Sequence, residues 1–327
     1  MTKNSKFSLF AIIPAFLLGF LARFFQIANG TDFSTGFLYD ENGFFMNFAF
    51  YGLLILTLAA VIALCILDKK RGSAYFENDV RNTMVDMRAV AVGFPMLVAG
   101  AMAAYEGYLQ TNALTPSAFL IFVDFFFGAA MVILGFVILY KKEITPAVGF
   151  SLVIPAVYYT LRGICVFIDR MVIASVPEYL IECLTIIGMG VFFMLLAKLL
   201  SGNESKRTRT AVSAVGATVS VMVLSSAIAT IAADLIYAHD IGTRIVANAN
   251  DAELGRQALI SQTAFMNVSD HGYHMAYTSW VDVILAVGII LVLAAMYAKA
   301  KPSQEEEKNE LPEIQQFPDD EEIETEE

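Results

Sequence analysis

Charged side chains lie inside several apolar stretches of this chain, and they are its strongest candidates for chemistry. Arg162 interrupts the run TPAVGFSLVIPAVYYTLRGICVFIDR, and Asp124 lies in FLIFVDFFFG without a polar neighbour in sequence. A charge in hydrocarbon costs at least about 2.5 kcal/mol unless it finds a partner or reaches water, so such residues default to ion pairs or ligand sites. Glu182, in the apolar run that follows Arg162, supplies a second carboxylate.

Arg162 and Glu182 are predicted to pair. They are symmetric about residue 172, the middle of the connection between their two runs, so a helical hairpin places them at matching depth. Asp124 is then a more independent carboxylate, while Glu106 and Asp282 lie close enough to the ends of their runs to reach interfacial water. Two interpretations remain open for the buried charges: ion pairs that fix helix packing, or a polar cavity that binds a small solute or ion.

Two tyrosines lie one helical turn before Arg162, and a second arginine, Arg23, lies inside the first apolar run. The tyrosines are expected either to line the cavity or to pack in the core with their hydroxyls bonded to the backbone. The candidate ligand-binding residues are therefore Arg162, Asp124, Glu182, Arg23, Tyr158 and Tyr159.

The elements that position these residues are expected to be membrane-spanning helices. The chain is 57% hydrophobic, with a mean hydropathy of +0.63, and runs of about 20 apolar residues match the length of a spanning helix. Backbone groups in lipid need internal hydrogen bonds, which a helix supplies. The sequence predicts an all-α polytopic membrane protein, a bundle of eight transmembrane helices at about 7–28, 44–67, 88–107, 117–140, 146–168, 179–200, 211–236 and 278–298.

The orientation follows from the distribution of lysine and arginine. In the eight-span topology, sixteen of the 21 basic residues lie on one side of the membrane, and Arg170, Arg244 and Arg256 lie on the other. Cytoplasmic loops carry the excess of basic residues, so both termini are predicted to be cytoplasmic.

Residues 1–300 form the predicted transmembrane domain, and residues 301–327 form a separate acidic tail. Residues 302–327 hold twelve of the 32 acidic residues and Lys308 as their one basic residue, so the net charge of −11 belongs to this stretch. A segment of this composition does not bury enough apolar surface to fold, so the tail is predicted to be disordered and cytoplasmic.

Three further segments carry structural predictions. The small residues of 211–236, such as Ser213 and Ala217, predict a helix packed among neighbours and not facing lipid. The apolar spacing in 68–88 predicts an amphipathic helix on the membrane surface. Residues 237–277 read as a long polar outer loop that holds all three histidines, with LGRQALISQ as a short helix inside it.

Motifs for catalysis are missing from the sequence. It has no Walker A loop, no GxGxxG after a strand, no HExxH and no GxSxG, and the spacing of its histidines matches no strong metal motif. We therefore expect no catalytic residues, no metal and no cofactor, and the absence of a basic aromatic surface argues against nucleic acid. The predicted function is binding or permeation of a small solute or ion at an outward-facing polar cavity in the lipid bilayer. The alternative is a non-catalytic sensor or assembly partner that uses the 237–277 loop and the acidic tail.

Three stretches, TGFLYDENGF, PAVYYTLRGICVFIDR and EYLIECLTIIGMGVFFMLLAK, resemble uncharacterised multi-spanning integral membrane proteins of anaerobic Gram-positive bacteria. The resemblance implies a bacterial plasma membrane and an eight-helix body. It implies no activity and assigns no functional residue.

Overall fold

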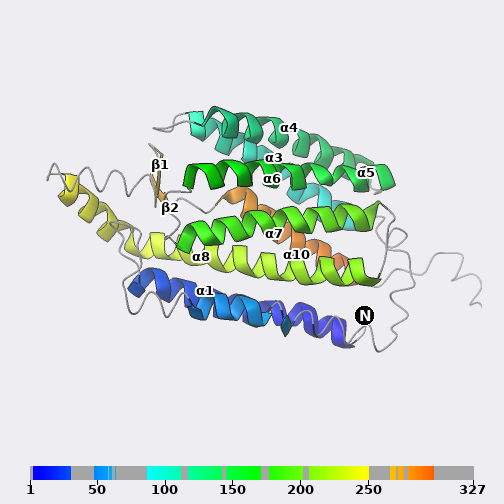
Figure 1. Cartoon of the computed structure of the whole chain (residues 1–327), viewed down its shortest axis with the longest axis horizontal. Helices are drawn as coiled ribbons and strands as arrows, with labels where there is room; N and C mark the ends of the chain where they lie inside the picture. The colour runs from blue at the N-terminus through cyan, green and yellow to red at the C-terminus, as the bar shows by residue number, and fades with distance from the viewer. Residues whose placement is uncertain are drawn as a thin grey trace, which may run out of the picture.

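The computed structural model describes residues 3–30, 48–57, 59–60, 63, 87–111, 117–141, 145–170, 177–201, 206–249, 266–269, 272–275 and 279–297. Apart from one short hairpin, the elements in these ranges are helices (Figure 1). They are α1 Lys3–Gly30, α3 Met87–Thr111, α4 Ala118–Lys141, α5 Pro146–Ser151, α6 Val153–Arg170, α7 Pro177–Leu200, α8 Lys206–Ala249 and α10 Trp280–Tyr297. The segment Phe48–Thr57 is also helical. Strands β1 (Met266–Ser269) and β2 (Gly272–Met275) pair antiparallel.

Within the described ranges, five helices are long and apolar enough to cross a membrane: Ala89–Thr111, Ala118–Lys141, Pro146–Ile168, Ile181–Leu200 and Thr208–Ala232. Three shorter apolar helices are Ile12–Ala28, Phe48–Thr57 and Trp280–Met296. Large apolar side chains such as Phe122, Phe126 and Ile133 face outward from this bundle, which a water-soluble domain of this size avoids over so large an area. The helices indicate a multi-pass membrane protein.

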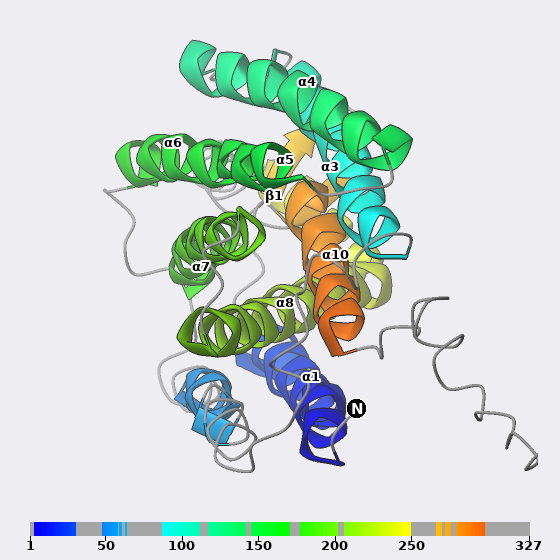
Figure 2. The same ribbon diagram turned by 90° about the vertical axis from the view of Figure 1, so that its right-hand side faces the viewer.

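Six helices form a ring in which each packs against the next, in the order α3, α4, α6, α7, α8, α10 and back to α3. Figure 2 shows this ring from one end of the bundle, with α1 packed outside it against α8. Successive helices run in opposite directions, so the end of one helix lies beside the beginning of the next. Side chains near α6's end and the beginnings of α7 and α10 therefore lie at one end of the ring.

Glycines bring α3 and α4 into backbone contact. A Cβ added at Gly100 would lie 2.6 Å from the Gly128 carbonyl oxygen, and one added at Gly135 would lie 2.7 Å from the Gly93 carbonyl oxygen. Gly93 and Gly100 are seven residues apart on α3, and Gly128 and Gly135 are seven residues apart on α4. The two glycines of each helix therefore face the partner helix. The two helices approach this closely because neither carries a side chain at these positions.

Helix α8 is the most enclosed of the five long apolar helices, as the sequence predicted from its small residues. In its apolar window 72% of the residues are buried, against 39–50% in the other four. Ser220 illustrates the packing, because its Oγ donates a hydrogen bond to the Ala286 carbonyl oxygen of α10 at 3.2 Å.

The prediction that helix 211–236 gives way to a loop over 237–277 was wrong in two respects. Helix α8 continues to Ala249, and the predicted loop contains the paired strands β1 and β2, of which β2 contacts α8. At 1.5 Å per residue, 44 residues span about 66 Å, roughly twice the hydrocarbon core. Figure 1 shows the last part of α8 extending beyond the other helices. The missed extension is polar, so hydropathy alone ended the helix too early.

The predicted helix 146–168 is interrupted at Leu152, which separates α5 from α6. Pro155 explains the break, because it has no N–H to donate and its ring clashes with the carbonyl of Ser151. At the other end of α5, Thr145 caps the helix by accepting a hydrogen bond from the Val148 amide at 3.4 Å.

Three predictions fall outside the described residues: nearly all of the 68–88 surface helix, the LGRQALISQ helix and the 301–327 tail.

Candidate functional site

The Arg162 guanidinium is buried and reaches across to α10. Its Nη1 lies 3.6 Å from Asp282 Oδ1 and donates hydrogen bonds to Ser279 Oγ at 3.1 Å and Tyr158 OH at 3.3 Å. The guanidinium also lies against the Tyr158 ring, 6.0 Å from its centroid. These contacts hold the cation inside the ring of helices, where an unpaired charge would be very costly.

The two adjacent tyrosines of α6 reach two different helices. Tyr158 donates its hydroxyl proton to Asp124 Oδ1 of α4 at 3.1 Å, and Tyr159 donates to Asp282 Oδ1 at 2.6 Å. Consecutive residues of a helix point about 100° apart, so neighbours face different partners, while Tyr158 and Arg162 share a face. Both tyrosines are fully buried. Their hydroxyls bind carboxylates, which differs from the backbone bonding considered in the sequence analysis.

Glu106 of α3 joins this network through the beginning of α10. Its carboxylate accepts hydrogen bonds from Ser279 Oγ at 2.9 and 3.0 Å, from the Trp280 amide at 2.9 Å and from the Val281 amide at 3.5 Å. The first amides of a helix have no partner within the helix, and the helix dipole favours a negative charge there. Glu106 therefore caps α10 from a neighbouring helix and is not simply exposed to interfacial water.

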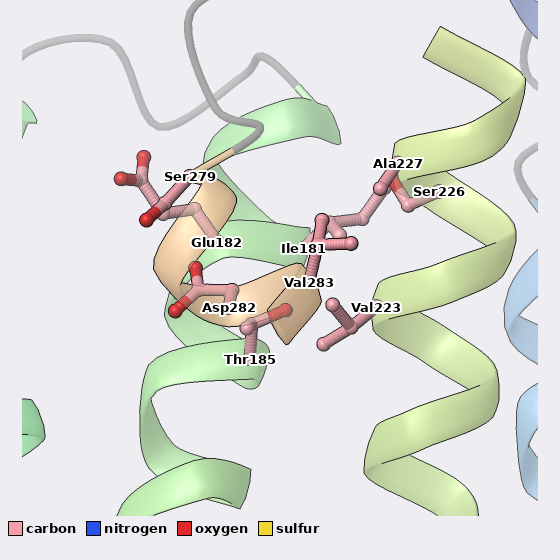
Figure 3. A pocket seen from close by; sticks show the side chains of 9 residues that line it. All are labelled: Ile181, Glu182, Thr185, Val223, Ser226, Ala227, Ser279, Asp282 and Val283. Atoms are coloured by element: carbon pink, nitrogen blue, oxygen red, sulfur yellow. The ribbon is translucent and has the colours of Figure 1, made fainter. Parts of the chain in front are cut away.

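A small cavity of about 20 Å³ lies beside the network, between α7, α8 and the beginning of α10. Figure 3 shows its lining: Ile181, Glu182 and Thr185 from α7, Val223, Ser226 and Ala227 from α8, and Ser279, Asp282 and Val283. Ser279 and Asp282 belong both to this lining and to the Arg162 network. The cavity and the charged network are therefore parts of one site.

The predicted pairing of Arg162 with Glu182 differs from the arrangement found, because the ion pair that the structure shows for Arg162 is with Asp282. Symmetry about the connection between α6 and α7 fixes the depth of the two side chains but not the direction in which each points. Arg162 points toward α10, and Glu182 lines the cavity instead.

Arg23 lies elsewhere in the bundle. It is fully buried on α1 and donates a hydrogen bond to Gln26 of the same helix. Helix α1 packs against α8, outside the ring that holds Arg162. Of the six predicted site residues, four lie in one hydrogen-bonded network and Glu182 lines the adjoining cavity, but Arg23 does not join them.

Three residues of the site were not among the predicted ones: Glu106, Ser279 and Asp282. Glu106 and Asp282 could have been predicted from the sequence, because each lies near the end of an apolar run on the same predicted side of the membrane as Arg162. Ser279 gave no sequence signal, because an isolated serine before a helix is ordinary.

The network contains three carboxylates, Glu106, Asp124 and Asp282, and one guanidinium. Repulsion between carboxylates is strong in a low-dielectric bundle, so this excess of acid favours the binding of a proton or a cation. Among the described residues, no three His, Cys, Asp or Glu side chains are grouped so that they could hold a metal ion.

No protein-family model matches this chain, and neither a curated protein nor a solved structure is significantly similar to it.

Proposed function

We propose that this protein binds a small solute or ion at a polar cavity that faces the outer side of the plasma membrane. The observation that carries the proposal is the convergence of polar side chains from all six helices of the ring at one end of the bundle. Five of these helices contribute Glu106, Asp124, Arg162, Glu182 and Asp282. The sixth, α8, contributes Ser226 to the cavity wall.

The topology that we propose has eight spans with both termini in the cytoplasm. The five long and three shorter apolar helices overlap the eight predicted spans, and the excess of lysine and arginine on one side supports the orientation. In this topology the Arg162 network lies toward the outer side. The alternative of a sensor or assembly partner draws no support from the site, since it relies on the 237–277 segment and the acidic tail.

Binding is tested with protein purified in lipid nanodiscs and a panel of inorganic ions and small polar solutes. A ligand that binds the native state raises the melting temperature by mass action, by an amount that grows with ligand concentration. Flux into proteoliposomes with the compounds that bind then distinguishes permeation from binding alone.

The variant Thr185→Val replaces a hydroxyl of the cavity wall by a methyl group of similar size. We expect it to weaken binding about tenfold, the effect of losing one hydrogen bond or ligand contact. Thr218→Val is the matched control, because the Thr218 hydroxyl donates to the Ala214 carbonyl oxygen within α8 at 2.9 Å. If no compound shifts the wild-type melting temperature, or if both variants bind as the wild type does, the proposal is contradicted.

A further inference from the structure

We propose that the buried carboxyl group of Asp124 is a reversible proton-binding site and that it carries its proton in the native protein at neutral pH. This inference goes beyond the proposed function, because it holds whether or not the cavity between α7, α8 and α10 binds a solute. It depends on how the partners of Asp124 differ from those of Glu106 and Asp282.

The other two carboxyl groups of the network have partners that favour a negative charge. Glu106 accepts hydrogen bonds from the first backbone amides of α10, at 2.9 and 3.5 Å. Asp282 lies in the first turn of the same helix, 3.6 Å from Arg162 Nη1. N–H donors, a nearby cation and a helix N-terminus each stabilise an ionised carboxylate. We therefore expect Glu106 and Asp282 to be ionised.

Asp124 has none of these stabilising partners in the part of the chain that the structure describes. Its one hydrogen bond there comes from the Tyr158 hydroxyl, to Oδ1 at 3.1 Å, and the guanidinium of Arg162 forms its ion pair with Asp282. Asp124 also lies beyond the first turn of α4, where the effect of the helix dipole has fallen off. The single guanidinium is therefore in direct contact with Asp282 and reaches Asp124 only through a hydroxyl.

The Asp124 side chain is buried among apolar groups. It is 4% exposed, and the backbone of α3 covers it, since a Cβ added at Gly107 would lie 3.0 Å from Asp124 Cβ. On the side of α6, the Phe127 ring packs against the Tyr158 ring with 6.3 Å between the centroids. An ionised carboxylate in such surroundings pays a desolvation cost that the neutral acid avoids.

The charged and titratable groups around Asp124 come from three helices. They are Tyr158 and Arg162 on α6, Glu106 on α3 and Asp282 on α10, while α5, which also contacts α4, carries no titratable residue. Arg162 attracts a negative charge on Asp124, and the two carboxylates repel it. Because this attraction is offset in part by the repulsion, desolvation decides in favour of the protonated form.

The hydrogen bonds of Asp124 remain in place when the proton binds. Arg162 Nη1 donates to Tyr158 OH at 3.3 Å, and Tyr158 donates to Asp124 Oδ1 at 3.1 Å. A guanidinium has no acceptor, so the tyrosine proton must point toward Asp124. The bound proton is therefore on Oδ2, and it can leave and return without breaking either hydrogen bond.

The test is infrared spectroscopy of the full chain over a pH series without added solute. A detergent that has no carbonyl group is used, because lipid esters absorb in the same region as a protonated carboxyl. An ordinary aspartic or glutamic acid ionises at about pH 4, so a protonated-carboxyl band at neutral pH reports an unusual site. We expect the wild type to show this band and Asp124→Asn to lose it.

Two matched variants control the assignment. Glu182→Gln and Glu106→Gln remove other carboxyl groups from the same end of the bundle, and both should keep the band. A wild type without the band at neutral pH would overturn the inference. Loss of the band in either control, with its retention in Asp124→Asn, would assign the proton to another carboxyl and also overturn it.

Tyr158→Phe tests the site while leaving the Asp124 carboxyl in place. The variant removes the hydrogen bond that stabilises the ionised form, so the band should persist to higher pH than in the wild type. Disappearance of the band at the same pH as in the wild type would contradict a proton on Asp124.

Melting temperatures distinguish a bound proton from a structural charge. At neutral pH, Asp124→Asn should be as stable as the wild type or more stable, because an amide replaces a neutral acid of similar shape. From about pH 4 upward the native wild type holds one more proton than its unfolded chain, so its stability should fall relative to the variant until Asp124 ionises. A large loss of stability in Asp124→Asn at neutral pH, or parallel pH profiles for the two proteins, would overturn the inference.

The results also separate this inference from the proposed function. If the band is absent from the wild type but a solute or ion still raises its melting temperature, the proposed function holds and the proton site fails. If the band behaves as expected and no compound binds, the proton site holds and the proposed function fails.

Discussion

At the scale of single residues, the site depends on how Arg162 is neutralised. Its guanidinium contacts Asp282 directly and reaches Asp124 and Glu106 through the hydroxyls of Tyr158 and Ser279. Removing one member of a buried ion pair is more costly than removing both, because the remaining charge stays buried without compensation. This asymmetry makes the pairing measurable.

Arg162→Met is therefore expected to destabilise the protein by about 3–5 kcal/mol, because it leaves Asp282 without its cation. Adding Asp282→Asn should recover part of the loss, giving a coupling energy of about 1–3 kcal/mol for this pair. The double-mutant cycle is measured by unfolding of the purified variants.

The matched cycle combines Arg162→Met with Glu182→Gln. Since Glu182 lines the cavity and Arg162 faces α10, we expect a coupling below about 0.5 kcal/mol. A larger coupling with Glu182 than with Asp282 would show that the pairing expected from sequence symmetry is correct and that the contact with Asp282 is secondary.

At the scale of elements, close packing between α3 and α4 holds Glu106 and Asp124 on adjacent helices. The packing depends on glycines, since a Cβ at Gly100 would lie within 2.7 Å of backbone atoms at both Gly128 and Val132. Backbone atoms cannot move aside as the tip of a flexible side chain does, so the helices would have to separate.

Gly100→Ala is expected to cost about 1–3 kcal/mol of stability through this overpacking. Gly52→Ala, in the helical segment Phe48–Thr57, is the control, because a Cβ there meets no atom within 4 Å. The control should be neutral or slightly stabilising, since alanine favours helix over glycine by about 0.5–1 kcal/mol. Melting temperatures of the two variants are compared, and equal values would contradict the close contact of α3 with α4.

At the scale of the whole molecule, the order of the helices around the ring differs from their order in the chain. Helix α10 closes the ring between α8 and α3, which brings Asp282 to Arg162, 120 residues earlier in sequence. Helix α1 lies outside this ring, which separates Arg23 from the site. The arrangement places the charged network at one end of the bundle, so its side of the membrane matters for function.

The proposed topology predicts which positions are reached from outside the cell. Single cysteines introduced at Thr35, Asn112 and Asn250 should react with a membrane-impermeant reagent on intact cells, whereas cysteines at Ser73 and Ser205 should react only after lysis. A chain without an introduced cysteine controls for the native thiols. External labelling at Ser73 would invert the orientation or break the eight-span topology.

The class of the protein and its most important buried side chains could be predicted from the amino-acid sequence alone. Hydropathy over about 20 residues is a local property, so the five long apolar helices appear where the sequence predicted spans. The cost of a charge in lipid is likewise set by its immediate surroundings. Arg162 and Asp124 could therefore be identified as candidate site residues from the sequence. The close packing of α8 could also be predicted from its small residues, because residue size is a local property of the sequence.

The tertiary structure decided which of these side chains meet. Depth in the membrane can be counted along one helix, but the direction of a side chain depends on the rotation of that helix and on its neighbours in the ring. Asp282 therefore replaced Glu182 as the partner of Arg162, and Glu106 became the cap of α10. The cavity also needed three packed helices to exist, because its wall is shared by α7, α8 and the beginning of α10, and no single segment of sequence contains that information.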